Sequence, residues 1–254
     1  MPTKKQPSAF EKYAHEYDLM TDAAAREPNH LKEIDLLISR FKPKRVLDAG
    51  CATGLTTVLF AERGVEAVGL DRSRPMIAMA KEKAARRNVE AQFVAGEFQK
   101  LPKRLDDSFD LVVCLANSIS GVDSLSGLTA SLRGFKRLLR PDGHLVLQLL
   151  NYAAIAEGEL FPVKVTQNDG IVYERFSERR GKVLSIYLTR ADLKQSPATL
   201  EAFRHDFDNF TADEVLTRVQ KVGFADIRSY GDLNLGSRFS KKKRDLVITA
   251  RKPS

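Results

Sequence analysis

A short turn between an apolar run and a predicted helix is the stretch of this sequence best suited to binding a ligand. The apolar run carries Asp48 near its end and leads through Gly50 and Ala52 to Gly54. In a sheet of parallel strands such a turn lies at the carboxyl ends, where ligands bind. Its small residues let the backbone approach a ligand closely. We call residues 50–54 the glycine turn.

The spacing of this turn argues against a dinucleotide site. A dinucleotide-binding loop has the pattern Gly-x-Gly-x-x-Gly, with the pyrophosphate at the amino end of the following helix. Here three residues separate Gly50 from Gly54, Ala52 takes the middle position, and no third glycine follows at the required distance. Asp48 would also repel a pyrophosphate and favours a ligand with an ammonium or sulfonium group.

A second acidic residue ends the next predicted strand. Asp71 lies 17 residues beyond Gly54, directly after the apolar run 65–70. A carboxylate at this position can accept hydrogen bonds from both hydroxyls of a ribose. The alternative is that Asp71 caps the following helix. Together with the glycine turn, the ribose interpretation is favoured.

The elements that must hold these residues alternate between strands and helices. Such alternation predicts right-handed crossovers and a doubly wound, mostly parallel sheet. The predicted strands are 44–49, 65–70, 91–95, 109–115 and 144–150, and the predicted helices are 53–63, the helix capped by Ser73, and 124–139, with a turn at 141–143.

The pattern changes after Asn151. Residues 171–176 and 182–189 alternate with the two-residue period of half-exposed strands, which predicts an antiparallel insertion. A helix capped by Thr211 and the strands 226–230 and 246–251 then complete a seven-stranded sheet whose last strand is reversed. The predicted domains are an N-terminal helical lid (1–42), a cofactor-binding core (43–150), the antiparallel insertion (151–205) and the completion of the core sheet (206–254).

The N-terminal stretch carries an aromatic stripe. Phe10, Tyr13, Tyr17 and Met20 recur at helical spacing. Such a stripe predicts either a helix packed on the domain or a lid whose aromatic face closes over a ligand.

Composition excludes several classes of protein. The 254 residues are 43% hydrophobic, which suffices for a sizeable core. No transmembrane run and no signal peptide are apparent, so the cytoplasm is the expected compartment. Two cysteines exclude a disulfide scaffold.

The net charge of +8 arises largely from basic clusters. An acidic partner such as RNA could use them, but no aromatic residues interleave to make a stacking platform, which favours solvated surface. The clusters are Lys4–Lys5, Arg86–Arg87, Arg179–Lys182 and Lys241–Arg244.

These residues together resemble the class I S-adenosylmethionine-dependent methyltransferases, over residues 8–252. The resemblance implies a Rossmann-like fold, S-adenosylmethionine as cofactor and S-adenosylhomocysteine as its product. Asp48, Gly50 and Gly54 match the cofactor loop, Ala52 stands where many members have glycine, and Asp71 matches the ribose-binding acid. The other cofactor-binding positions that it implies are Cys51, Arg72, Met76, Glu97, Phe98, Leu115 and Asn117.

Two short motifs resemble the glycine and sarcosine N-methyltransferase branch. Leu115–Ser118 follows the fourth predicted strand, and Asn151 with Tyr152 follows the fifth. The resemblance implies that Asn151 contacts the substrate, with Ser118 and Tyr152 nearby. It also implies that an arginine upstream of the loop binds the methionine carboxylate, and Arg26 lies at a comparable separation.

The reaction implied is in-line displacement at the sulfonium methyl, with the acceptor atom about 3 Å from the methyl carbon. A base is needed only for a protonated nucleophile or a hydroxyl. Tyr17 and His205 are the candidates for this base, and a surface role is the alternative for His205.

Arg175 could hold a substrate carboxylate, because a guanidinium suits that bidentate contact. Asparagines at 117 and 151, where catechol-type enzymes have acids, predict no metal.

The leading hypothesis is a methyltransferase acting on a small molecule, such as an amine. The alternatives are an RNA methyltransferase, for which the basic clusters would line one face beside the cofactor, and a non-catalytic cofactor-binding protein. No membrane partner is expected. The insertion could shape the acceptor site, or form the interface of a homo-oligomer through its apolar face.

Overall fold

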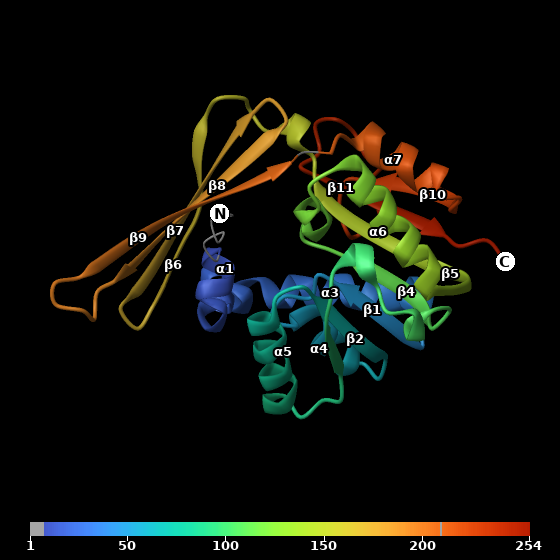
Figure 1. Ribbon diagram of the computed structural model, residues 1–254, viewed down its shortest axis with the longest axis horizontal. Helices are drawn as coiled ribbons and strands as arrows, with labels where there is room; N and C mark the ends of the chain where they lie inside the picture. The colour runs from blue at the N-terminus through green and yellow to red at the C-terminus, as the bar shows by residue number, and fades with distance from the viewer. Residues whose placement is uncertain (1–7, 209) are drawn as a thin grey trace, which may run out of the picture.

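Two separate β-sheets organise the chain in this computed structural model, which describes residues 8–208 and 210–254 (Figure 1). The strands of the larger sheet are β1 (Arg45–Ala49), β2 (Glu66–Asp71), β3 (Gln92–Ala95), β4 (Phe109–Cys114), β5 (Leu139–Leu150), β10 (Ala225–Tyr230) and β11 (Asp245–Arg251). Their order is β10-β11-β5-β4-β1-β2-β3. Strands β1 to β5 pair in parallel, whereas β11 is antiparallel to both neighbours. The predicted Rossmann-like sheet with a reversed last strand is confirmed.

Helices cover both faces of the larger sheet (Figure 1). One face carries α3 (Ala23–Phe41), α4 (Leu55–Ala61) and α5 (Arg74–Arg86), and the other carries α6 (Leu125–Leu138) and α7 (Ala212–Lys221). Each face has its own buried cluster of aliphatic and aromatic side chains. Short 3₁₀ turns follow several strands: η2 (Phe98–Lys100), η3 (Lys103–Leu105), η4 (Ser118–Gly121) and η5 (Tyr152–Ala154).

Local sequence signals place the helix starts. The Ser73 side chain accepts a hydrogen bond from the Met76 N–H at the start of α5. Thr211 and Glu214 form the predicted capping box of α7, in which each side chain bonds the other residue's N–H. Within the described residues, no helix is both long and apolar enough to cross a membrane.

The insertion is larger than predicted. Its sheet contains four antiparallel strands, β6 (Leu160–Asn168), β7 (Ile171–Arg180), β8 (Val183–Asp192) and β9 (Thr199–Asp208). The two predicted strands correspond to β7 and β8. The outer strands β6 and β9 were missed, and they extend the sheet to an arm that projects beside the core (Figure 1).

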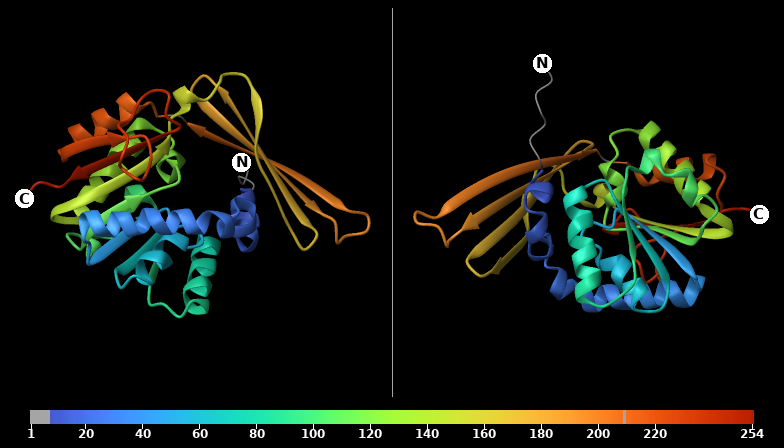
Figure 2. Two further views of the ribbon diagram at one scale, coloured as in Figure 1. Left: turned by 180° about the vertical axis from the view of Figure 1, so that it is seen from behind. Right: turned by 60° about the horizontal axis from the view of Figure 1, so that its bottom comes forward.

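The predicted N-terminal helix is broken into short pieces. They are α1 (Ala9–Lys12), η1 (Ala14–Glu16) and α2 (Tyr17–Thr21), and Asp22 with φ of 51° separates α2 from α3. Figure 2 shows this N-terminal segment between the antiparallel sheet and α5. Its apolar side chains pack on the antiparallel sheet, in a cluster with Tyr173 and Leu188. Periodicity alone could not reveal these breaks.

The turn predicted at 141–143 lies inside β5. Asp142 takes a left-handed φ of 61°, and the pairing with β4 shifts from Phe109–Leu139 to Leu111–His144. The turn at 141–143 is therefore an irregularity within the longer strand β5, and it does not end that strand.

Gly69 offers a test of the packing beneath the glycine turn. A Cβ there would lie 2.7 Å from Phe93, 2.8 Å from Thr57 and 2.9 Å from Cys51. We expect Gly69→Ala to lower the free energy of unfolding by about 1–3 kcal/mol, the usual cost of overpacking. Urea denaturation measures this. Gly96→Ala is the control, because its Cβ would meet only Leu70, at 3.5 Å; equal losses in both variants would contradict the expectation.

Candidate active site

The glycine turn is fixed to the end of β2 by its own N–H groups. The N–H groups of Gly50 and Cys51 donate to the Leu70 carbonyl, at 2.7 and 3.0 Å. The Ala52 N–H donates to Oδ2 of Asp71, at 3.0 Å. Three successive N–H groups are thus used within the protein, and the turn is rigidly placed at the carboxyl edge of the sheet.

The glycines of the turn are needed for packing. Gly50 and Gly54 have φ of 87° and 81°, and a Cβ on Gly50 would lie 2.5 Å from the Cβ of Ser118. Ala52 also adopts a left-handed φ of 46°. This conformation explains why glycine would suit position 52, and the alanine occupies it at some conformational cost.

Asp71 faces the turn and does not cap α5. Its Oδ1 accepts from the Ser73 N–H at 2.8 Å, while Ser73 itself is the N-cap. A carboxylate has about four lone-pair sites, so each Asp71 oxygen keeps capacity for a further donor. Burial raises the pKa of Asp71.

Asp48 lies beneath the turn. Its side chain is 2% exposed and accepts a hydrogen bond from the Thr57 hydroxyl at 2.8 Å. Burial raises the pKa of Asp48 to about 6, against the smaller opposing effect of the Thr57 bond. The carboxylate therefore supports the start of α4 and adds negative potential under the turn.

Cys51 and Cys114 are buried thiols. The Cys51 sulfur packs towards Gly69, and Cys114 is inside β4. Burial raises the pKa of both thiols well above the usual range. Cys51 can thus meet a ligand through its backbone only.

The expected adenosine-binding positions divide into buried and exposed residues. Met76 and Leu115 are buried, and Phe98 is partly buried against Phe135, with ring centroids 5.4 Å apart. Arg72 and Glu97 are exposed, and Glu97 pairs with Lys100 at 3.1 Å.

Asn117 organises the loop after β4. Its Nδ2 donates to the Tyr152 hydroxyl at 2.8 Å, and its Oδ1 accepts from Ser120 and from the Leu150 N–H. Tyr152 is 1% exposed. Ser118 donates to the Gly50 carbonyl at 3.3 Å. The structure therefore favours a supporting role for Asn117 and Tyr152 over the ligand contacts expected from the sequence.

Asn151 holds the basic loop Lys241–Arg244. Its Nδ2 donates to the carbonyls of Lys241 and Lys243, at 3.0 and 2.7 Å, and its N–H donates to that of Arg244, at 2.8 Å. Asn151 is buried. These bonds use the Nδ2 group, and not the Oδ1 atom, of the amide that was expected to contact substrate, and they place the basic loop at the carboxyl edge of β5.

Tyr17 brings the N-terminal segment to this edge. The charges that influence its pKa are those of Arg26, Asp71, Arg175 and Asp18, although burial dominates and raises the pKa. A raised pKa keeps the phenol protonated at neutral pH, so Tyr17 is better suited to orient an acceptor than to act as a phenolate base. Tyr17 therefore lies near enough to Arg26, Asp71 and Arg175 for their charges to influence its pKa.

His205 shares an aromatic neighbour with Tyr17. The ring centroid of Phe10 lies 5.9 Å from that of Tyr17 and 6.0 Å from that of His205. His205 also packs edge-on against Phe207, with the ring centroids 4.4 Å apart. These ring contacts fit a packing role for the imidazole.

The two faces of the antiparallel sheet differ. The inner face carries Tyr173, Arg175 and Arg190 and packs against the N-terminal segment. The outer face exposes Leu160, Val165 and Leu200. The inner face fits the acceptor-binding alternative, and the outer face fits the oligomer alternative.

The basic clusters do not share one face. Arg87 pairs with Glu27 and Glu62, and the Arg179–Lys182 cluster pairs with Glu157, Glu178 and Glu214. Lys4–Lys5 lies outside the described residues. Of the described clusters, Lys241–Arg244 is the one at the candidate site.

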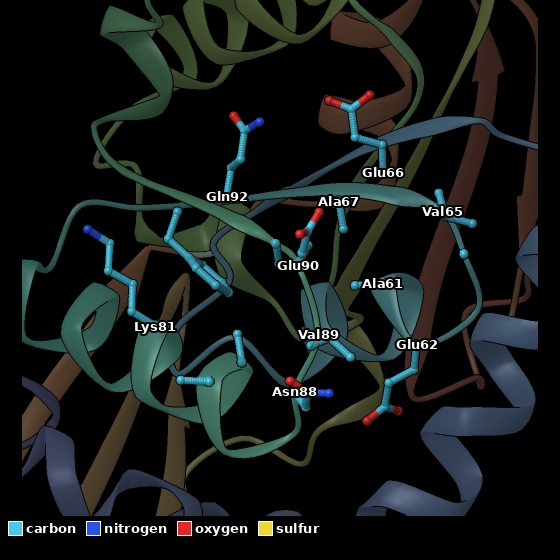
Figure 3. Close-up of a pocket in the computed structure, with 15 residues that line it drawn as sticks. Ala61, Glu62, Val65, Glu66, Ala67, Lys81, Asn88, Val89, Glu90 and Gln92 are labelled. Carbon is cyan, nitrogen blue, oxygen red and sulfur yellow. The ribbon is translucent and has the colours of Figure 1, made fainter.

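A groove of about 840 Å³ lies elsewhere, beside α5 (Figure 3). Lys81, Glu66, Glu90 and Gln92 are among the residues that line it. It sits at the amino ends of β2 and β3, whereas ligands of doubly wound sheets bind at the carboxyl ends. None of the expected site residues lines it.

Sequence reasoning missed a buried polar group behind the turn. Lys83 on α5 is 7% exposed on its side chain and donates to Thr53 at 3.1 Å and to Asp18 at 2.9 Å. The available signal was a lysine within the apolar stripe of Met76, Ala80 and Ala84. No group of three or more metal-ligating side chains occurs within residues 8–208 and 210–254.

The fold and these side chains define the class of protein. The sheet has seven strands, and its last strand is reversed. The glycine turn lies at its carboxyl edge, with the N–H groups of Gly50, Cys51 and Ala52 occupied and the carboxylates of Asp48 and Asp71 beside it. Such a turn does not suit a pyrophosphate. Asp71 keeps acceptors for a ribose diol, and Met76 and Phe98 supply apolar surface, so the residues fit S-adenosylmethionine.

Comparison with known proteins agrees. Residues 46–143 match the family described as methyltransferase domain. The chain is 25% identical over 241 residues to glycine/sarcosine N-methyltransferase of Aphanothece halophytica, covering 89% of this chain and 83% of the relative. It is 27% identical to the cypemycin N-terminal methyltransferase of a Streptomyces species, covering 90% and 98%. A methyltransferase structure from Clostridium acetobutylicum has a TM-score of 0.77 at 15% identity, covering 96% and 99%.

This chain is a methyltransferase, and its fold is the one found in class I S-adenosylmethionine-dependent methyltransferases. A structural neighbour that binds S-adenosylmethionine, an amino pentose methyltransferase from Micromonospora echinaspora, has a TM-score of 0.69 at 21% identity, covering 97% of this chain and 99% of the neighbour.

Asp71 is the first residue to test. We expect Asp71→Ala to weaken binding of S-adenosylhomocysteine by about 1–3 kcal/mol, the scale of lost hydrogen bonds to a charged acceptor. Calorimetry measures this, and Glu66→Ala, at the other end of β2, is the control. Because burial raises the Asp71 pKa, wild-type affinity should fall on acidification while that of the variant stays flat. Unchanged affinity in a folded variant would contradict ribose binding.

Asp48 should make stability depend on pH. Its pKa of about 6 in the folded state exceeds the value near 3.9 of an unfolded chain. Because the folded state holds the Asp48 proton more tightly than the unfolded state does, protonation stabilises the fold below pH 4. This stabilisation, roughly 3 kcal/mol, is lost as the pH rises from 4 to 6. Asp48→Asn keeps an acceptor for Thr57, so its stability relative to wild type should increase from pH 4 to 6. Urea denaturation at several pH values measures this; a constant difference would refute it.

Proposed function

We propose that this methyltransferase acts on an amine nitrogen of a small molecule that also carries an anionic group. The observation that carries the proposal is Arg175. Its Nε is buried without a hydrogen-bond partner among the described residues, and burial lowers the guanidinium pKa. A buried cation without a partner is costly, and a carboxylate or phosphate is the group that would satisfy it.

The charges around Arg175 support an anionic acceptor. Arg26 and Arg244 are near enough to influence the Arg175 pKa, and both oppose its positive charge. Among the described residues, no carboxylate lies within ion-pair distance of these three arginines. The loop Lys241–Arg244 adds further positive charge at the same edge. Such a potential concentrates anions.

The relatives support nitrogen as the acceptor atom. The names of both curated relatives describe methyl transfer to nitrogen or to an N-terminus. An amine that is already neutral needs no strong base, which agrees with the raised pKa of Tyr17. The acceptor is thus proposed to be an amine, held through its anionic group.

The cofactor-binding residues are proposed on the same basis. Asp71 would accept from the ribose hydroxyls, Arg26 would hold the methionine carboxylate, and Met76 and Phe98 would contact the adenine. When bound, S-adenosylmethionine supplies an electrophilic methyl group on a sulfonium sulfur.

The protein's own contribution is orientation and exclusion of water. Arg175 would fix the anionic end of the acceptor, and the Tyr17 hydroxyl would accept a hydrogen bond from the amine and direct its lone pair. The N-terminal segment covers this edge and shields the amine from water, which strengthens both contacts. The nitrogen lone pair forms the new bond to the methyl carbon, the carbon–sulfur electron pair stays with sulfur, and the amine proton leaves to solvent.

The test uses acceptors in matched pairs. With methyl-labelled S-adenosylmethionine, we expect transfer to amines that carry a carboxylate or phosphate and little transfer to their neutral analogues, such as glycine against glycinamide. Equal or better transfer to the neutral members would overturn the proposal. RNA is included as a further acceptor, and its methylation would likewise overturn it.

Arg175 should decide acceptor affinity. We expect Arg175→Gln to lower kcat/KM for the anionic acceptor by about a hundredfold, the cost of a lost charge-assisted contact of roughly 3 kcal/mol. Affinity for S-adenosylhomocysteine should stay near wild type. Arg179→Gln is the control, because Arg179 lies on the same strand but pairs with Glu157 at 3.2 Å. Equal losses in both variants would refute the role of Arg175.

A further inference from the structure

Three consecutive residues of the N-terminal segment point to three different places. Glu16 contacts the antiparallel sheet, and Asp18 contacts the core beside the glycine turn. Tyr17, between them, packs against the ring of Phe10 at 5.9 Å and lies near enough to Asp71 and Arg175 for their charges to influence its pKa. The placement of each of these side chains follows from its contacts, and the aromatic stripe seen in the sequence does not predict it.

Glu16 is held by the antiparallel sheet. Its two carboxylate oxygens accept from Nε and Nη2 of Arg190, both at 2.8 Å, and one of them also accepts from the Tyr173 hydroxyl. The side chain of Arg190 is 9% exposed, and it also lies over the ring of Tyr13, at 4.4 Å. This bidentate pair is shielded from solvent, so it fixes orientation as well as distance.

Asp18 is held by the core. Its Oδ1 accepts from the Thr53 hydroxyl at 2.6 Å and from Lys83 Nζ at 2.9 Å, and Oδ2 lies 2.8 Å from the same ammonium group. Thr53 belongs to the glycine turn, and Lys83 lies on α5. Burial lowers the Lys83 pKa, and Asp18 counteracts that shift. Lys83 therefore needs Asp18 as its partner.

The two ion pairs form a strut between the sheets. The N-terminal segment stands between the antiparallel sheet and α5 (Figure 2). Tyr17 occupies the middle of the strut, so a movement of either end changes where its hydroxyl lies. The contacts of Glu16 reach Tyr173 on β7 and Arg190 on β8, and β7 also carries Arg175.

We propose that Glu16 and Asp18 are positioning residues that set Tyr17 for methyl transfer and couple the glycine turn to the antiparallel sheet. A cofactor bound against the glycine turn restrains Thr53 and, through it, Asp18. Asp18 in turn restrains Tyr17, Glu16 and the strand β7 that carries Arg175. By linkage, an acceptor bound on the sheet favours the cofactor to the same degree. That the sheet binds the acceptor rests on the proposed function; the coupling itself does not.

Hydrogen exchange with S-adenosylhomocysteine tests the coupling without any acceptor. In wild type, ligand binding should slow exchange in residues 9–22 and also in β7 and β8 around Tyr173 and Arg190, by about tenfold, the usual scale of coupling between sites. Asp18→Asn and Glu16→Gln should bind the same ligand yet lose the slowing in β7 and β8.

Glu157→Gln is the matched control. Glu157 pairs with Arg179 of the same sheet and has no contact with the N-terminal segment among the bonds of the described residues, so this variant should keep the full slowing. Lys83→Arg retains a cation for Asp18 and should keep part of it. Slowing confined to the glycine turn in wild type, or slowing in β7 and β8 that survives both Asp18→Asn and Glu16→Gln, would overturn the proposal.

Activity gives an independent measure. With an acceptor identified by the matched pairs, Asp18→Asn and Glu16→Gln should lower kcat more than they raise either KM, because they displace Tyr17 without removing a ligand contact. Should Asp18→Asn fail to fold, Glu16→Gln alone decides the question. Failure to find an anionic amine acceptor would sink the proposed function, while the exchange experiment would still judge the strut.

Discussion

The hydrogen bonds between the glycine turn and the end of β2 determine what this site can bind. The N–H groups of Gly50, Cys51 and Ala52 all donate to the backbone or the carboxylate at the end of β2. Loops that cradle phosphates leave such N–H groups free. With these donors used, the charges nearest the turn are the carboxylates of the buried Asp48 and of Asp71, and they attract a sulfonium and not a pyrophosphate.

The same constraint separates two electrostatic regions at one edge of the sheet. Acidic groups lie at the turn, between β1 and β2, whereas Arg26 and Arg244 are near enough to Arg175 on the antiparallel sheet for their charges to lower its pKa. Other basic side chains of the described residues are paired with carboxylates, for example Arg87 with Glu27 and Arg190 with Glu16. The net charge of +8 therefore matters less than its distribution. A cationic cofactor and an anionic acceptor can lie side by side without sharing contacts.

Sequence patterns predicted the parts of this structure that depend on local or periodic signals. The caps at Ser73 and Thr211, the parallel strands and the reversed last strand all follow from such signals. Strands β6 and β9 lack a clear alternation, and the breaks in the N-terminal segment arise from its contacts with another sheet. The substrate contact of Asn151 stays a prediction, while its bonds to carbonyls about ninety residues away are contacts that no spacing rule reveals.

The N-terminal segment shows why ionic contacts were harder to predict than apolar ones. Its stripe of Phe10, Tyr13 and Met20 predicts burial, and those residues pack on the antiparallel sheet. Apolar packing is non-directional, so a slide along the sheet would bury a similar area. The bidentate pair of Glu16 with Arg190 and the bonds of Asp18 to Thr53 and Lys83 are directional, and they select one placement. The orientation of Tyr17 thus depends on the ion pairs of Glu16 and Asp18, whose partners are distant in sequence. The apolar area that the N-terminal segment buries depends instead on its stripe of apolar residues.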